Sequence, residues 1–176
     1  MVEPLQSVRF NILRNAIYHT ARRRSNERRN RGSNFVVLLL GTAAVGNATA
    51  GSPLAVEVIG AAVAVIGALQ LVFDFGGQAR DHQSLQKAYF DLLADAQASN
   101  DANAEQIADL QARMLRITAE EPPVLKAIDA RAYNDAVDAM GLAQNQRLHI
   151  PLIDRLLGGV LAFDGRMYLK EEERSG

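Results

Sequence analysis

Three histidines are the side chains of this chain best suited to acid–base or metal chemistry. His19, His82 and His149 lie far apart in sequence, and none has the spacing of a metal motif such as HExxH. Asp81 precedes His82 directly, but adjacent residues on a helix point about 100° apart and do not meet. The chain also has no phosphate-binding loop, no GxGxxG motif, no nucleophile elbow and no cysteine. The sequence therefore predicts no catalytic site, metal or cofactor, and a protein that is not an enzyme.

A second set of polar residues lies within or at the edges of two long apolar runs: Thr42, Asn47, Glu57, Gln70 and Asp74. Polar groups are costly in lipid and tend to face a bundle interior or an aqueous path. One interpretation is a pore formed by several copies, lined by rings of Asn47 or Glu57. The other is ordinary hydrogen bonding between helices. The sequence leaves both open.

Six arginines stand just before the first apolar run: Arg22, Arg23, Arg24, Arg28, Arg29 and Arg31. Residues 1–33 carry eight basic and two acidic residues, whereas the other 143 carry 11 basic and 18 acidic ones. Such a cluster orients a neighbouring membrane span and binds anionic lipid. Nucleic acid is the rival partner, but no aromatic residue interleaves the arginines, and we do not expect it.

The elements that must position these residues begin with a basic amphipathic helix. Leu5, Val8, Ile12 and Ala16 recur at spacings of three and four, which predicts a helix over residues 4–31. His19 extends the same stripe. Gly32-Ser33-Asn34 is a predicted break, and residues 1–33 form the first region of the chain.

Residues 34–75 are predicted to be a transmembrane hairpin. No charged residue occurs between positions 32 and 56 or between positions 58 and 73. A bilayer core takes roughly 20 helical residues to cross, and backbone groups in lipid must bond internally, so both spans should be α-helical. A tight turn over residues 50–53, with Pro53 opening the second helix, makes the two spans antiparallel.

Small residues recur in both runs, which predicts close helix packing either within one hairpin or between copies. They are Gly41, Ala44, Gly46, Ala48, Gly60, Ala64 and Ala68.

Lysine and arginine flank the hairpin on one side only. The arginine cluster precedes the first span, Arg80 and Lys87 follow the second, and the turn has neither residue type. The positive-inside rule therefore places both termini in the cytoplasm. About 33 polar residues precede the first run, so the start of the chain does not read as a secretory signal.

Residues 76–176 are predicted to form a cytoplasmic helical region, which makes the fold all-α. Leu85, Tyr89, Leu92 and Ala96 define one helical stripe, and a break is expected over residues 99–103. Pro122-Pro123 should separate this region from another helix that ends at Gly141. The last apolar stretch, residues 150–163, is too short for a span and should pack on the bundle or lie at the membrane interface.

The order of these features resembles the SLATT-domain family, the SMODS- and SLOG-associating two-transmembrane effector domains. The resemblance lies in DFGGQARDHQSLQKAYFDLLADA after the second run and in EEPPVLKAIDARAYNDAVDAMG further on, with Tyr133-Asn134. In the first segment, the family's helical pattern is matched by Ala79, His82, Leu85, Tyr89 and Leu92.

The resemblance implies a bacterial effector that oligomerises and perforates the inner membrane when a linked sensor detects infection. It implies a separate sensor or nucleotide-signal enzyme as partner, because no fused sensor is recognisable. Two other hypotheses stand beside it. One is a membrane-anchored scaffold that recruits a cytoplasmic partner and conducts nothing. The other is a soluble helical bundle with the hairpin as its core, although the rest of the chain is too short to wrap two such helices.

Overall fold

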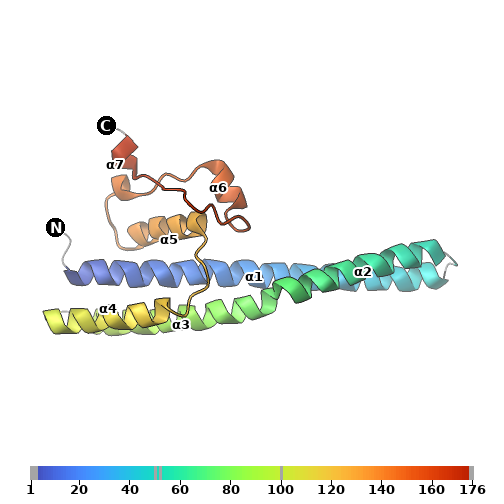
Figure 1. Ribbon diagram of the computed structural model, residues 1–176, viewed down its shortest axis with the longest axis horizontal. Helices are drawn as coiled ribbons and strands as arrows, with labels where there is room; N and C mark the ends of the chain where they lie inside the picture. Colours follow the sequence, from blue (N-terminus) through green and yellow to red (C-terminus); the bar gives the residue numbers. More distant parts are fainter. Residues whose placement is uncertain (1–3, 50, 52, 100, 175–176) are drawn as a thin grey trace. The chain divides into compact units, whose positions relative to one another are not determined.

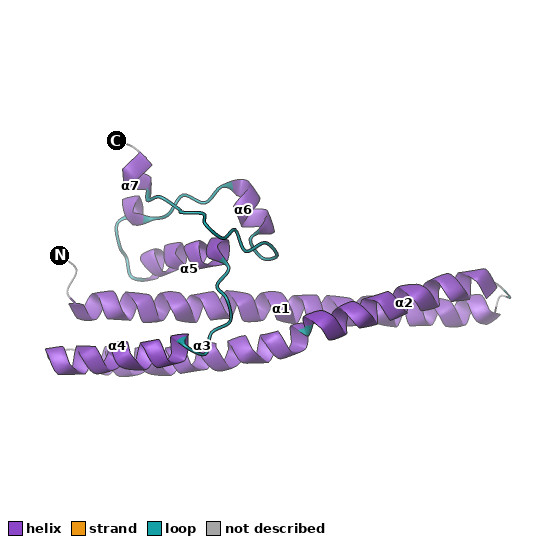
Figure 2. Cartoon of the chain, in the orientation of Figure 1, coloured by secondary structure: helices purple, strands orange, loops and turns teal. Residues whose placement is uncertain are grey.

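The computed structural model describes residues 4–49, 51, 53–99 and 101–174, and within these ranges the regular elements are helices with no strand (Figures 1 and 2). The prediction of an all-α fold is thereby confirmed. The elements are α1 (Pro4–Thr49), α2 (Pro53–Phe73), α3 (Phe75–Ala98), α4 (Ala104–Thr118), α5 (Lys126–Ala139), the 3₁₀ turn η1 (Gln144–Gln146), α6 (Leu152–Leu157) and α7 (Glu171–Arg174).

The first helix continues through the predicted break. α1 is a single helix of 46 residues that includes Gly32. The prediction of a break at Gly32-Ser33-Asn34 is wrong because one glycine costs a helix only about 1 kcal/mol, which the apolar residues that follow offset. Ser33 also stays within the helix by donating its hydroxyl to the Arg29 carbonyl at 2.9 Å.

The ends of α2 match the local signals. Pro53 opens the helix, and Gly51 before it has a φ of 74°, a left-handed conformation that glycine adopts at no steric cost. Asp74 separates α2 from α3 with a φ of 36°, and its side chain accepts a bond from the Gly77 N–H at 2.9 Å. A Cβ at Gly77 would collide with the Asp74 carboxylate, so a larger residue there would displace this side chain.

The chain divides into two compact units, and each is described by itself. Unit 1 comprises Met1–Arg22 and Asp81–Gly176, and unit 2 comprises Arg23–Arg80. Helices α1 and α3 contribute residues to both.

Unit 2 is a helical hairpin. The second half of α1 and α2 run side by side in opposite directions (Figures 1 and 2). Gln70 of α2 donates to Asn34 of α1 at 2.8 Å. At the open end of the hairpin, Asn26 donates to Gln78 at 3.3 Å, and the Arg29 guanidinium lies 5.9 Å from the centre of the Phe75 ring.

Unit 1 has an apolar core in which the first turns of α1 pack against α3 and α4. The stripe predicted on α1 is buried together with the stripe on α3. This core comprises Leu5, Val8, Ile12, Ala16, Tyr89, Leu92, Leu93, Ala96 and Leu110. Arg9 closes one end of the core by donating to the Ala96 carbonyl, its Nη2 at 2.8 Å. A carbonyl near the end of α3 is thus satisfied by a cation.

The remaining predicted boundaries of unit 1 are confirmed. Asn103 caps α4, and its side chain and that of Gln106 each accept a backbone N–H bond from the other residue, at 2.9 Å. Gly141 follows α5 with a φ of 65°. Asn134 of α5 is buried and bonds both the N–H and the carbonyl of Leu148, at 2.7 and 2.9 Å, which fixes the segment after η1.

The last apolar stretch of unit 1, residues 150–163, is buried at a few residues only. Ile150, Asp154 and Gly158 are buried, and Asp154 accepts a bond from Tyr168 at 2.9 Å and lies 3.2 Å from Arg166. The large apolar side chains of the stretch remain in solvent: Leu152, Ile153, Leu156, Leu157, Val160 and Leu161. Packing of this stretch on the bundle is therefore limited to one side.

Candidate functional site

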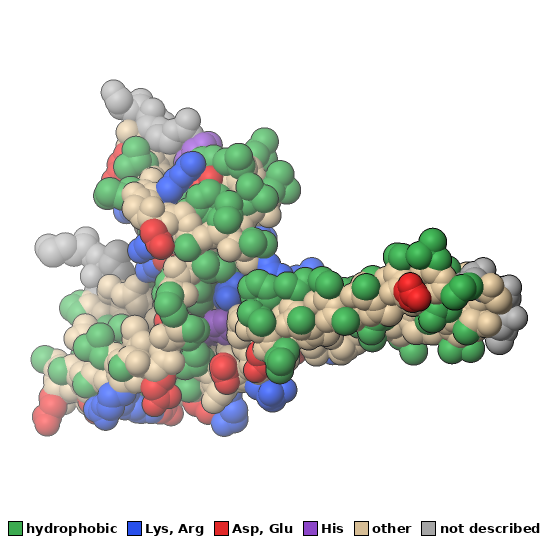
Figure 3. All heavy atoms as spheres, turned by 45° about the vertical axis from the view of Figure 1, so that its right-hand side comes forward, with side chains coloured by type: hydrophobic (Ala, Val, Ile, Leu, Met, Phe, Trp, Pro, Cys, Tyr) green, Lys and Arg blue, Asp and Glu red, His purple; other side chains and the backbone are tan. Residues whose placement is uncertain are grey.

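The apolar side chains of unit 2 face outward. α2 has no buried residue, and Leu71, Val72 and Leu54 keep 84%, 76% and 72% of their surface exposed. In Figure 3 hydrophobic side chains are spread along the visible face of the hairpin, with other surface between them. On α1, Leu38 and Val45 are each 66% exposed. An apolar surface of this extent marks a membrane or protein interaction site.

One helical stretch of the described chain meets a length and composition test for a membrane span. It is Pro53–Ala98, whose most apolar window has a mean hydropathy of 2.2 and no buried residue. That window lacks the burial expected of a core helix in a soluble protein. The second half of α1, the other predicted span, is not identified by the same test within the described residues.

The polar residues predicted at membrane depth have separate roles in the hairpin. Thr42 and Asn47 donate to carbonyls of their own helix, those of Leu38 and Ala43, at 3.0 and 2.9 Å. Gln70 makes the bond to Asn34 across the hairpin. Glu57 is exposed on α2 and Asp74 forms the turn before α3. Within one copy the structure therefore does not bring these residues together.

The glycines of the hairpin are open. A Cβ added to Gly41, Gly46 or Gly60 would meet no atom within 4 Å. These glycines therefore provide no close approach of α1 to α2, and the interpretation that they pack within one hairpin is wrong for them. Ala64 and Ala68 are exposed as well.

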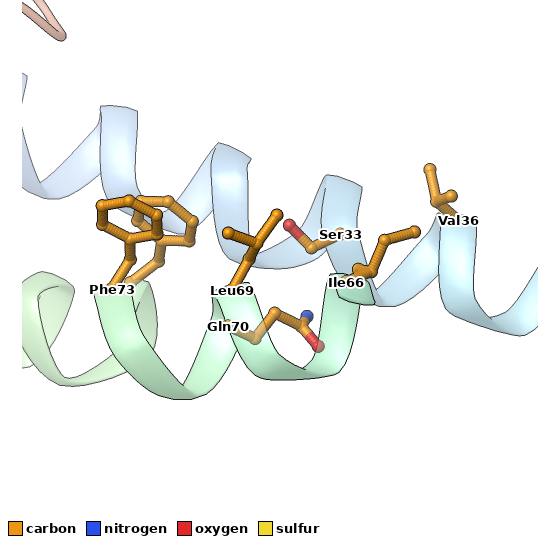
Figure 4. Close-up of a pocket in the computed structure, with 7 residues that line it drawn as sticks. Ser33, Val36, Ile66, Leu69, Gln70 and Phe73 are labelled. Carbon is orange, nitrogen blue, oxygen red and sulfur yellow. The ribbon is translucent and has the colours of Figure 1, made fainter. Parts of the chain in front are cut away.

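An open groove of about 330 Å³ lies between the two helices of the hairpin. Ser33, Val36, Ile66, Leu69, Gln70, Phe73 and Phe75 line it (Figure 4). Its wall is almost entirely apolar, and its polar groups are the Gln70 amide and the Ser33 hydroxyl, which already bonds within α1. The groove has the character of a lipid or helix contact rather than of a reaction site.

The arginine cluster lies on α1 and is partly occupied by local contacts. Arg23 lies 3.3 Å from Glu27, and Arg31 lies 4.0 Å from the same carboxylate. Arg28 donates to the carbonyl of Arg24 at 3.2 Å. Arg24, Arg28 and Arg31 are exposed, which leaves their charges accessible to anions.

Unit 1 contains a buried polar cluster that the sequence analysis did not predict. His19 of α1 and His82 of α3 are 0% and 2% exposed, and their Nδ1 atoms lie 2.9 Å apart. The other nitrogen of His19, Nε2, lies 3.2 Å from a carboxylate oxygen of Glu121. The Tyr89 hydroxyl bonds both Glu121 and Thr118, and the Tyr89 ring stacks on His19 at 5.5 Å.

Four of the α3 residues that carry the resemblance, His82, Leu85, Tyr89 and Leu92, lie in unit 1, and the fifth, Ala79, lies in unit 2. Ala79, His82, Leu85, Tyr89 and Leu92 are all buried. The sequence signal for His19 was its place on the apolar stripe of α1, whereas nothing in the sequence indicated that Glu121 would meet it. The partner histidines are separated by 63 positions, which no local motif spans.

The contacts of the cluster specify where its protons lie. An ionised Glu121 accepts from Tyr89, and a proton on His19 Nε2 faces the same carboxylate. With its proton on Nε2, His19 has a bare Nδ1 that accepts from His82 Nδ1–H. This tautomer assignment satisfies the hydrogen bonds of Tyr89 with Glu121 and of His82 with His19, and it directs the Nε2–H of His19 toward Glu121 at 3.2 Å.

Burial and neighbouring charges shift the cluster's pKa values. Burial lowers the pKa of His82 to about 4, helped by the charges of Arg22 and His19 and opposed by Glu121. Burial raises the pKa of Glu121, but the hydrogen bonds of His19 and Tyr89 outweigh it and bring the pKa below its usual value. Burial and the bond to Glu121 raise the pKa of Tyr89. At neutral pH the carboxylate is charged and the phenol is not.

The cluster does not form a metal site in this arrangement. Among the described residues no group of three or more His, Asp or Glu side chains converges as metal ligands do. His19 directs its two nitrogens at different partners, so no single point is close to all three groups. The third histidine of the chain, His149, does not belong to this cluster. It lies 3.4 Å from Glu171.

Comparison of the chain with protein-family models, curated proteins and solved structures gave no match.

Proposed function

We propose that this protein is an oligomeric two-transmembrane effector that permeabilises the bacterial inner membrane in an anti-phage or conflict system. The observation that carries the proposal is the exposed apolar hairpin: its most apolar helix, α2, buries no residue. Transfer of this apolar surface from water into lipid is favourable by roughly 25 cal/mol for each Å² of surface removed from water. The effector role comes from the resemblance to the SLATT-domain family.

Two features of the hairpin support assembly of several copies. The glycines at positions 41, 46 and 60 have open space where a side chain would stand, which leaves room for a helix of another copy. Asn47 donates within its own helix and Glu57 is exposed on α2, and a ring of copies would bring them together.

The proposed topology places both termini in the cytoplasm and the turn outside. The absence of cysteine makes it testable with single-cysteine variants. Leu54→Cys, near the turn, should react with a membrane-impermeant maleimide in intact spheroplasts. Gln83→Cys, on α3, should react only after the membrane is permeabilised. The reverse pattern would contradict the orientation, and equal labelling of both in a soluble fraction would support a soluble bundle.

Permeabilisation is tested by expression and by liposome leakage. Overexpression should depolarise cells, and Asn47→Leu and Glu57→Ala should change the conductance of reconstituted protein. Gln111→Leu and Glu105→Ala, two exposed positions on α4, are matched controls that should not. Normal membrane potential and growth with abundant protein in the membrane would contradict the effector role.

A non-conducting, membrane-anchored scaffold is the second candidate function. The exposed apolar side chains around α6 favour it, because Leu156 and Met167 are 81% and 87% exposed and a soluble partner would cover them. A stoichiometric partner in pull-downs that Leu156→Asp abolishes, together with liposomes that do not leak, would favour the scaffold over the effector.

A further inference from the structure

The contact between His19 and His82 limits how many protons the pair can hold. Two ring nitrogens at 2.9 Å form a hydrogen bond only if one of them is bare, because each imidazolium carries hydrogens on both nitrogens. A neutral pair satisfies the contact, and so does a pair with one added proton. Two imidazolium rings would point two N–H groups at each other.

The first added proton can be stabilised by the Glu121 carboxylate. A charged His19 lies 3.2 Å from Glu121, so the pair of charges is neutral overall, and its Nδ1–H can donate to a His82 whose proton has moved to Nε2. The hydrogen bond between the two rings reverses its direction but survives.

A second added proton, on His82, has no partner of opposite charge that could stabilise it. A charged His82 would lie beside a charged His19 and near Arg22, and its burial leaves no solvent to screen the three cations. The other titratable groups around the pair offer limited relief. Glu121 is already paired with His19, Tyr89 and Tyr18 are neutral phenols, and Asp129 of α5 is paired with Arg14.

We propose that the His19–His82 pair is a proton-operated latch between α1 and α3 of unit 1, which holds while one of the two Nδ1 atoms is bare and opens when both rings are charged. The latch joins helices 63 positions apart and lies between the buried apolar core around Tyr89 and the contact of Tyr18 with the Leu125 N–H. Its opening therefore loosens the packing of α1 on α3. The inference concerns unit 1 alone and does not rest on the proposed membrane function.

The test follows the whole chain in detergent or nanodiscs between pH 7.5 and 4. Hydrogen exchange of residues 81–98 reports opening, after correction for the intrinsic pH dependence of exchange. If opening takes up one proton, the open population should rise roughly tenfold for each pH unit below its onset. ¹⁵N-imidazole NMR of the wild type should show one added proton with the pair intact and a second only with opening.

His82→Gln supplies a side chain that cannot take the second proton, and its exchange should become independent of pH in this range. His149→Gln is the matched control, since it removes a histidine that is 43% exposed, and its exchange should follow the wild type. An acid response in His82→Gln equal to that of the wild type would overturn the proposal. So would NMR spectra in which both rings are charged while the pair persists, a readout that needs no variant and holds if His82→Gln fails to fold.

Discussion

The two units of this protein use apolar residues in opposite ways. In unit 1 the stripes of α1 and α3 face each other, and Ile12, Ala16 and Tyr89 are 0% exposed. In unit 2 the most apolar helix of the chain buries no residue. Polar groups differ as well, since unit 1 encloses His19, His82 and Asp154, whereas Thr42 and Asn47 of the hairpin bond to carbonyls of their own helix.

The difference is the one expected if unit 1 folds in water and unit 2 lies in lipid, as we propose. A unit in water gains stability by hiding apolar side chains, and it tolerates a buried polar cluster when each group finds a partner. A hairpin in lipid has no need to bury its leucines and instead must keep its polar groups bonded within its own helices. Four predictions test this contrast.

The largest effect should come from charging the surface of the hairpin. Val65→Arg combined with Leu69→Arg places two cations in the middle of α2, and each costs about 3 kcal/mol for insertion at the centre of a membrane. The double variant should leave the carbonate-washed membrane fraction. Gln83→Arg combined with Gln111→Arg, at exposed positions of unit 1, should leave partitioning unchanged. Full retention of the double α2 variant would refute a lipid-facing hairpin.

The next effect concerns the core of unit 1. Ile12→Ala removes a fully buried side chain and should lower the free energy of unfolding by about 3 kcal/mol. All four tyrosines lie in unit 1 and the chain has no tryptophan, so tyrosine fluorescence during urea unfolding in detergent reports on this unit alone. Ile153→Ala, 56% exposed, is the control and should change stability by less than about 0.5 kcal/mol. Equal effects would mean that the core is misassigned.

Acid should destabilise unit 1. The pKa of His82 is about 4 in the folded chain, below its ordinary value of 6.5, so the unfolded chain binds this proton first as the pH falls. Stability should therefore decrease from pH 6.5 down to pH 4, by on the order of 3 kcal/mol in total. Urea unfolding monitored by tyrosine fluorescence at several pH values measures it. A flat profile, or an equal decrease in His82→Gln, would contradict the assignment.

The smallest effect belongs to the polar bond inside the hairpin. Gln70→Leu removes the bond to Asn34 and should destabilise the pair of helices by about 0.6 kcal/mol, the average for such bonds in membranes. Titration of the reconstituted chain with a denaturing detergent, followed by helix content, measures the difference. Gln83→Leu is the control on α3. A loss of several kcal/mol would indicate that Gln70 does more than join two helices.

Local signals predicted most of the element boundaries. Pro53 and Gly141 begin or end helices as the sequence indicated, and the break predicted over residues 99–103 separates α3 from α4, because such signals act on the backbone within a few residues of themselves. Gly32 is the exception. Its local cost of about 1 kcal/mol was real but too small to end a helix that apolar residues on its C-terminal side sustain.

In the candidate site, too, some features can be read from the sequence and others cannot. The charge asymmetry, the uncharged runs and the stripe on α3 are visible in the sequence, and the burial of the α3 stripe follows from its hydrophobic periodicity. The pairing of His19 with His82 and Glu121 is not visible. Each of the three looks like an ordinary helical or loop residue until the helices that carry them are packed together.

The sequence by itself determined that the chain is helical, where most of its helices end, and that one part is far more apolar than the rest. Only the tertiary structure decided that α1 is unbroken, that the hairpin glycines are open and that two histidines share one buried hydrogen bond. The physical reason is the distance along the sequence over which each kind of interaction acts. Backbone preferences and caps act over a few residues, whereas a contact across 63 positions exists only after separate helices have found a common core.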